Sequence, residues 1–167
     1  NLLLLQIRKL AVKVNNSPTV LLPLWETKCG LVKLKHVRLR QDVTTRWNSM
    51  YDAGIRALEY RGAIDAITGD RTAGLREFRL DDEEWDLLED LLDLLKVFKD
   101  ATLYFSREST SIADVIPAMD HIDSVLANAM ENTTISTALR GCANLSRRVM
   151  NRYYSLTDAT PAYRIAM

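Results

Sequence analysis

Hydrophobic residues recur at helical spacing through most of the chain. One apolar face over residues 2–14 is formed by Leu3, Ile7, Leu10 and Val14, and the run NNSP at 15–18 favours a turn after it. A second helix is expected from residue 21 to Lys28, capped by Ser17 or Thr19 and stopped by Gly30 in the left-handed conformation. Together these two segments predict a helical hairpin.

Residues 31–40 change the period of the pattern from 3.6 to about two. Their sequence is LVKLKHVRLR, in which Val32, Leu34, Val37 and Leu39 are separated by Lys33, Lys35, Arg38 and Arg40. This alternation, with a phase shift at His36, predicts one basic β-strand. The helical period returns over residues 46–59 and again in a short helix around 63–67, closed by Gly69.

The second half of the pattern predicts three longer helices. The strongest runs over 81–105, with Asp82 as its cap and an apolar arc broad enough to be buried between two neighbours. A helix through residues 115–126 is capped by the run STS at 109–111, and a last helix spans about 134–154. In that last helix we expect an inward face formed by Leu139, Cys142, Leu145, Val149 and Tyr153.

Composition fits one ordinary globular domain of 167 residues with a net charge of zero. No apolar run approaches the roughly 20 residues that span a bilayer, which argues against a membrane protein. The first residue is Asn, and no basic segment precedes the first apolar run, so we expect a fragment of a longer chain. The two cysteines, far apart in sequence and without a secretion signal, fit a reducing compartment.

The zero net charge conceals a segregation of signs along the chain. Residues 1–48 carry nine basic and two acidic side chains, a balance of +7, whereas residues 81–100 carry nine acidic and two basic ones, a balance of −7. A basic block suggests a surface that faces a polyanion, although helix faces of opposite sign exposed to solvent would give the same pattern.

Most catalytic and metal-binding chemistries find no support in the sequence. The two imidazoles, His36 and His121, have no nearby nucleophile in a recognisable arrangement, and Cys29 and Cys142 lack zinc-ligand spacing. The acidic residues of the helix at 81–105 share one outer face, whereas metal-dependent phosphoryl transfer needs carboxylates that converge from different elements. We therefore assign no catalytic residue, no metal ligand and no cofactor within these residues.

The segment 42–51 is different, because its polar side chains are unusually dense for the start of an amphipathic helix. Its sequence is DVTTRWNSMY. Arg46 can contact a phosphate bidentately, and Trp47 can stack on an unpaired base. An equally weighted alternative is structural, with Trp47 buried as a core anchor and Arg46 paired with Asp42.

This segment and its continuation, DVTTRWNSMYDAGIRALEYRGAID, resemble the part of hAT-superfamily transposases that carries their Arg-Trp motif. The resemblance extends to Trp85 with its leucine-rich helix, and to Thr110 followed by Val-Ile-Pro at 115–117. It implies a mainly α fold that is part of an interrupted RNase H-like fold. Residues 1–68 would be a segment of the catalytic core, residues 69–159 part of the helical insertion, and residues 160–167 could begin a returning core strand.

The resemblance also implies a function, namely cut-and-paste DNA transposition. In the family, the tryptophan that matches Trp47 lies near the active site and stabilises DNA during hairpin formation. The expected DNA contacts are Arg46 and Trp47, with Lys33, Lys35, Arg38 and Arg40 added from the basic strand. The family's three catalytic carboxylates match no residue here, so we expect no activity from this fragment alone, and Mg²⁺ or Mn²⁺ only in the parent enzyme.

The remaining expectations follow from the same resemblance. They are a nuclear location, transposon-end DNA as the partner, and homo-oligomer contacts only in regions outside the fragment. The rival hypothesis is a domesticated or degenerate derivative that serves as a helical protein-interaction module without catalysis. In that case the broad apolar helix from Trp85 to Phe105 would be partly exposed to a partner.

Overall fold

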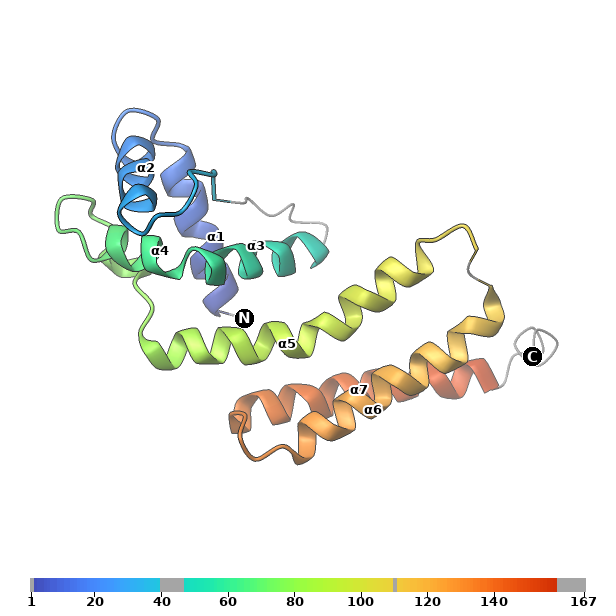
Figure 1. Cartoon of the computed structure of the whole chain (residues 1–167). Helices are drawn as coiled ribbons and strands as arrows, with labels where there is room; N and C mark the ends of the chain where they lie inside the picture. The colour runs from blue at the N-terminus through green and yellow to red at the C-terminus, as the bar shows by residue number, and fades with distance from the viewer. Residues whose placement is uncertain (1, 40–46, 110, 159–167) are drawn as a thin grey trace. The chain divides into compact units, whose positions relative to one another are not determined.

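The computed structural model describes residues 2–39, 47–109 and 111–158. For residues 47, 157 and 158 it describes the backbone only. This part of the chain forms seven α-helices (Figure 1): α1 Leu2–Asn15, α2 Leu21–Leu31, α3 Trp47–Glu59, α4 Arg61–Thr68, α5 Asp82–Phe105, α6 Val115–Glu131 and α7 Thr137–Asp158. Two short 3₁₀ helices, η1 Arg76–Phe78 and η2 Ile112–Asp114, precede α5 and α6. The chain divides into two compact units, Asn1–Leu92 and Asp93–Met167, within α5.

The predicted helical hairpin opens the first unit. The Ser17 hydroxyl accepts a hydrogen bond from the Leu21 amide at 3.3 Å, but neither Ser17 nor Thr19 is the N-cap of α2, which is Val20. The expected stop at Gly30 is wrong, because α2 continues to Leu31 and the left-handed residue is Lys33, with φ of 58°. The Leu34 amide donates to the Cys29 carbonyl at 2.9 Å, which is the 6→1 bond of a Schellman motif.

The basic strand predicted over residues 31–40 is not formed. Leu31 ends α2, residues 32–33 form a turn, and residues 34–39 have no strand partner among the described residues; Arg40 lies outside them. Side chains take the place of a partner strand as hydrogen-bond donors to alternate backbone carbonyls. The bonds run from Tyr60 Oη to Lys35 O (2.8 Å), from Trp25 Nε1 to Val37 O (2.9 Å) and from Asn15 Nδ2 to Leu39 O (2.8 Å).

Helices α3, α4 and the first turns of α5 complete the first unit. At Gly54 of α3, an added Cβ would lie 2.7 Å from a terminal methyl of Leu92, so the glycine permits close packing of the two helices. The cap of α5 is Asp81 and not the expected Asp82: Asp81 and Glu84 exchange hydrogen bonds between side chain and backbone amide at 2.8 and 3.0 Å. Trp85 is buried and donates from Nε1 to Asp65 of α4 at 3.1 Å.

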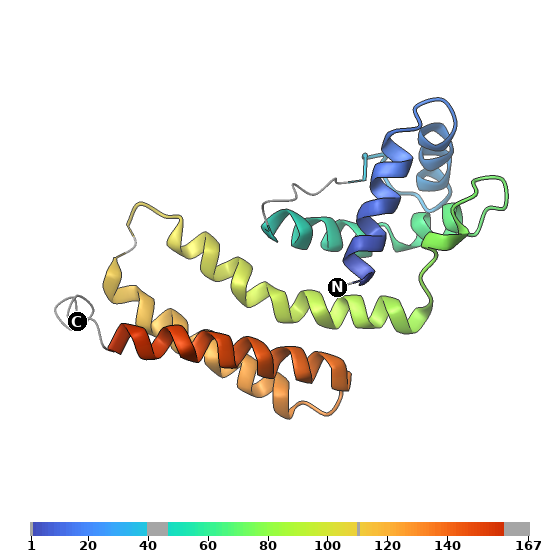
Figure 2. The ribbon, with the colours of Figure 1, turned by 180° about the vertical axis from the view of Figure 1, so that it is seen from behind.

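The second unit is built around the antiparallel pair α6 and α7 (Figure 2). One buried cluster of this unit consists of Leu94, Leu126 and Ala143, with Phe98, Ile122 and Met150 packed against it. A Ser111–Asp114 capping box precedes α6, in the region where the sequence predicts a cap. Helix α7 begins at Thr137, later than the expected residue 134, and continues to Asp158.

The predicted inward face of α7 is wrong except at Leu139. Cys142, Leu145, Val149 and Tyr153 are exposed, whereas Ala143 is fully buried. Two polar contacts fix the rotation of the helix on α6. The Arg147 guanidinium donates hydrogen bonds of 2.7 and 2.9 Å to the Asp123 carboxylate, and Tyr154 Oη donates one of 2.9 Å to Asp120. The small side chain of Ala143 lies on the same side as these contacts.

The described residues are mainly α-helical and contain no β-strand. None of their helices combines the length and apolar character that crossing a bilayer requires. The RNase H-like assignment and the expected boundary at residue 68 stay predictions. Residues 160–167, expected to begin a core strand, lie outside the described residues.

We predict that Tyr60→Phe lowers the free energy of unfolding by about 1 kcal/mol, because it removes the donor to the Lys35 carbonyl and keeps the buried ring. Urea unfolding followed by circular dichroism measures this. Tyr153→Phe is the matched control, since Tyr153 is 55% exposed. Equal unfolding midpoints for the two variants would contradict the role of the Tyr60 hydroxyl.

Candidate nucleic-acid interface

The exposed cations of residues 33–38 form the part of the candidate interface that the structure describes. Lys33, Lys35 and Arg38 are exposed, while Leu39 is buried against the helices. The predicted phase shift at His36 is present, because His36 and Val37 are both half-buried. Lys33 lies in the turn that follows α2, and Lys35 and Arg38 follow it along the chain, so one short stretch carries all three exposed cations.

The other predicted site residues lie at the edge of what the structure describes. Arg40 and Arg46 are outside the described residues. Trp47 is the first residue of α3, but its side chain is not described, so the choice between a buried anchor and a stacking platform stays open. The structure therefore brings Lys33, Lys35 and Arg38 together on one stretch of backbone, and it does not relate them to the Arg46–Trp47 pair.

The three described cations have no acidic partner in the part of the chain that the structure describes. No carboxylate oxygen there lies within the 4.0 Å that defines an ion pair with Lys33, Lys35 or Arg38. The nearby lysine of α2, Lys28, is instead neutralised by Asp70 at 2.8 Å. Positive charge that is not compensated within the protein is available to a polyanion.

Lys33 combines this exposure with backbone strain. It is the one non-glycine residue with positive φ in the described chain. A left-handed conformation costs a residue with a Cβ roughly 1–2 kcal/mol, and glycine would remove that cost.

A second basic group lies between α4 and α5 and was not predicted from the sequence. Arg71, Arg76 and Arg79 line one polar pocket of the first unit. Three arginines within nine residues could have signalled it, but nothing in the sequence shows that the neighbouring acids are engaged by other helices.

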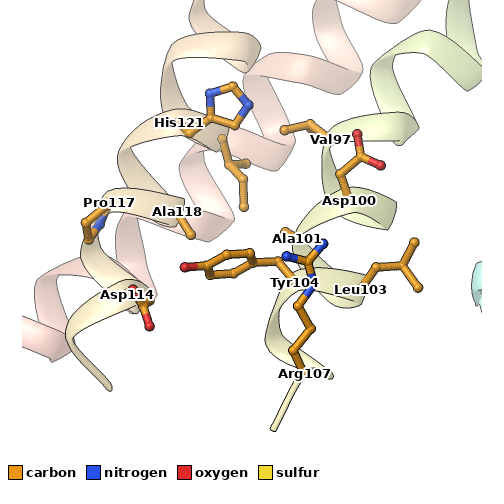
Figure 3. A pocket seen from close by; sticks show the side chains of 11 residues that line it. Val97, Asp100, Ala101, Leu103, Tyr104, Arg107, Asp114, Pro117, Ala118 and His121 are labelled. Atoms are coloured by element: carbon orange, nitrogen blue, oxygen red, sulfur yellow. The ribbon is translucent and has the colours of Figure 1, made fainter. Parts of the chain in front are cut away.

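A larger, mainly apolar pocket of about 490 Å³ lies in the second unit, between the end of α5 and the start of α6 (Figure 3). Tyr104 points across it towards Pro117 and Asp114, and His121 lies at its rim. A hydrogen bond to Asp114 raises the pKa of Tyr104 above its ordinary value. None of the residues predicted from sequence to contact DNA lines this pocket.

The structure also describes Cys29 and the acidic face of α5, which the sequence raises as candidates for other chemistry. Cys29 is fully buried in α2, and burial raises the pKa of its thiol to about 11, which keeps it protonated near neutral pH. The described residues contain no group of three or more potential metal ligands. The acidic face of α5 is exposed, as expected, at Asp82, Asp86, Glu89 and Asp93.

Comparison with known proteins gives one distant similarity. The chain is 26% identical over 167 residues to human Zinc finger BED domain-containing protein 4; the match covers 96% of this chain and 14% of the length of that protein. No protein-family model and no solved structure matches the chain significantly.

We predict that Lys33→Gly raises the free energy of unfolding by roughly 0.5–1 kcal/mol, because glycine relieves the left-handed strain at this position. Lys35→Gly is the matched control: it makes the same chemical change in extended backbone and is expected to lower stability. Thermal and urea unfolding measure both variants. Destabilisation of equal size in the two would contradict the strain at Lys33.

Proposed function

We propose that this chain is a DNA-contacting segment of a transposase-derived protein, related to the hAT superfamily. The observation that carries the proposal is the basic stretch 33–38, in which three exposed cations without described acidic partners lead along the chain to the Arg46–Trp47 motif. The expected partner is DNA at transposon ends, in hairpin or unpaired form. The distant similarity to a BED-type zinc finger protein is compatible with this origin.

The proposed DNA binding uses two kinds of contact, with phosphates and with an unpaired base. Lys33, Lys35 and Arg38, with Arg40 and Arg46, bind backbone phosphates and fix the position of the DNA. Trp47 supplies a flat aromatic surface at the start of α3, on which an unpaired base stacks. Neither contact requires a particular base, so we expect recognition of DNA shape and strand ends more than of sequence.

Catalysis is outside the proposed role of these residues. The family's three carboxylates match no residue of this chain, and we expect them, with their Mg²⁺ or Mn²⁺, elsewhere in a parent enzyme. We also expect any homo-oligomer contacts there, and a nuclear location for the whole protein. Whether the parent is an active enzyme is decided by extending the reading frame and looking for the three carboxylates.

A second candidate function, a helical protein-interaction module, is favoured by one observation. The face of α7 formed by Leu145, Val149, Tyr153 and Leu156 is between 53% and 62% exposed. The helix expected to serve this role, from Trp85 to Phe105, is buried at Trp85, Leu88 and Leu92, and it exposes large apolar side chains in its last turn, at Leu103, Tyr104 and Phe105. The interaction module would therefore use α7, and substitutions there would leave DNA binding unchanged.

We predict that Trp47→Ala weakens binding of fluorescently labelled hairpin DNA by about 5- to 150-fold, the equivalent of the roughly 1–3 kcal/mol of one stacked base. Fluorescence anisotropy measures the dissociation constant. Tyr153→Ala removes an exposed aromatic ring from α7 and serves as the control. Unchanged affinity of the Trp47 variant, at an unchanged unfolding midpoint, would exclude the stacking role.

We further predict that Lys35→Gln combined with Arg38→Gln reduces the dependence of binding on salt. Each phosphate contact contributes about −0.9 to the slope of log K against log salt for duplex DNA, so the double variant should lose up to about 1.8. Lys9→Gln with Arg148→Gln removes the same charge from exposed positions on α1 and α7. Equal salt slopes for the two double variants would contradict phosphate contacts by Lys35 and Arg38, because the change would then depend only on the net charge of the chain.

A further inference from the structure

The loop between α4 and α5 forms a polar pocket in the first unit, apart from the basic stretch 33–38. The pocket has a volume of about 390 Å³ and is lined by Arg71, Arg76 and Arg79 together with the loop around Gly69 and Gly74. This volume falls in the range of about 300–1,000 Å³ typical of small-ligand sites. The pocket is distinguished by the three guanidinium groups that line it.

The loop holds the arginines in place through buried neighbours in the sequence. Leu75, Phe78 and Leu80 are buried in the core, at exposed fractions of 0%, 9% and 3%. The residues between them, Arg76 and Arg79, are exposed as a consequence. Gly74, which precedes the 3₁₀ helix η1, has a φ of +61°, a conformation that a residue with a Cβ rarely adopts.

The acidic residues that could neutralise these arginines are engaged elsewhere. The Lys28 ammonium of α2 binds Asp70 at 2.8 Å and holds the pKa of that carboxyl well below its ordinary range. Lys13 of α1 binds Glu77 at 2.9 Å. Asp81 caps α5, and Asp82 pairs with Arg61.

The pocket therefore keeps an excess of positive charge. In the described chain no carboxylate lies within the 4.0 Å ion-pair limit of Arg71, Arg76 or Arg79.

Several backbone amides of the loop already have acceptors within the chain. The amides of Gly69, Asp70 and Ala73 donate to backbone carbonyls, and the Thr72 amide donates to the Asp70 carboxylate at 2.9 Å. The side chains that line the pocket add the guanidinium N–H groups of Arg71, Arg76 and Arg79 as donors, and the planar fork of a guanidinium matches two oxygens of one phosphate. A ligand that suits this pocket is a tetrahedral oxyanion with several unshared oxygens.

We propose that the pocket of Arg71, Arg76 and Arg79 binds a phosphate group and that, resting on the proposed function, this group belongs to the backbone of the bound DNA. The pocket then provides a second anchor on the DNA, independent of the basic stretch and of the Arg46–Trp47 motif. A phosphate in this position neutralises the positive charge of the arginines that the acidic residues of the loop leave uncompensated.

The first test uses the 167-residue chain with inorganic phosphate and no DNA. In two-dimensional NMR spectra at constant ionic strength, the amide resonances of Gly69 and Gly74 should shift saturably with phosphate and not with chloride. Arg76→Gln with Arg79→Gln should weaken this binding by about tenfold or more for each guanidinium lost. The absence of a saturable shift, or the same shift in the variant, overturns the proposal whatever the chain does with DNA.

The second test identifies the source of the phosphate. In hairpin-DNA titrations, the Arg76–Arg79 double variant should lose about 0.9 from the salt slope, while Arg148→Gln on α7 leaves it unchanged. Loss of DNA binding in Trp47→Ala with an unchanged slope in the pocket variant overturns the DNA role of the pocket alone. The reverse pattern overturns the Arg46–Trp47 proposal alone. Unfolding midpoints equal to wild type exclude misfolding as the cause.

Discussion

Three side-chain hydrogen bonds to alternate carbonyls hold the segment on which the proposed DNA contact depends. Asn15, Trp25 and Tyr60 come from three different places in the first unit and bind Leu39, Val37 and Lys35 in turn. Each donor satisfies a backbone group that a neighbouring strand would otherwise pair. The segment thereby stays extended on a helical surface, with its cations exposed to solvent.

This arrangement ties the core of the first unit to its charge pattern. Trp25 is fully buried, so the indole that donates to Val37 also anchors the hairpin of α1 and α2. The same hairpin carries Lys13 and Lys28, which engage the two acids of the loop before α5. One group of helices thus leaves two basic surfaces without described acidic partners, the stretch 33–38 and the arginine pocket. Neutral net charge conceals both.

Helices with one strong apolar face could be predicted from the sequence, and features decided by distant partners could not. The hairpin and α5 follow from periodicity and turn residues, and the expected exposure of the acidic face of α5 is confirmed. Residues 34–39 alternate as a strand does, but whether a strand or side chains pair with them depends on residues as far away as Asn15 and Tyr60. The alternating pattern can therefore be seen in the sequence, but the groups that hydrogen-bond to this segment cannot.

Helix α7 shows the same limit on its packing. It has two apolar stripes, and periodicity alone selects the larger one, with Leu145, Val149 and Tyr153. The ion pair of Arg147 with Asp123 selects the other, where Ala143 is buried. In the candidate site, Lys33, Lys35 and Arg38 were predicted from the sequence and are exposed, whereas the arginine pocket depends on pairings across 42 and 64 residues.

The most direct measurement is a map of amide hydrogen exchange along the chain with and without hairpin DNA. Binding through the extended basic segment predicts slower exchange at residues 33–38 and in the first turn of α3, with α6 and α7 unchanged. Protection confined to α7, or no protection at 33–38 at saturating DNA, would contradict the proposed contact and favour a protein-interaction module.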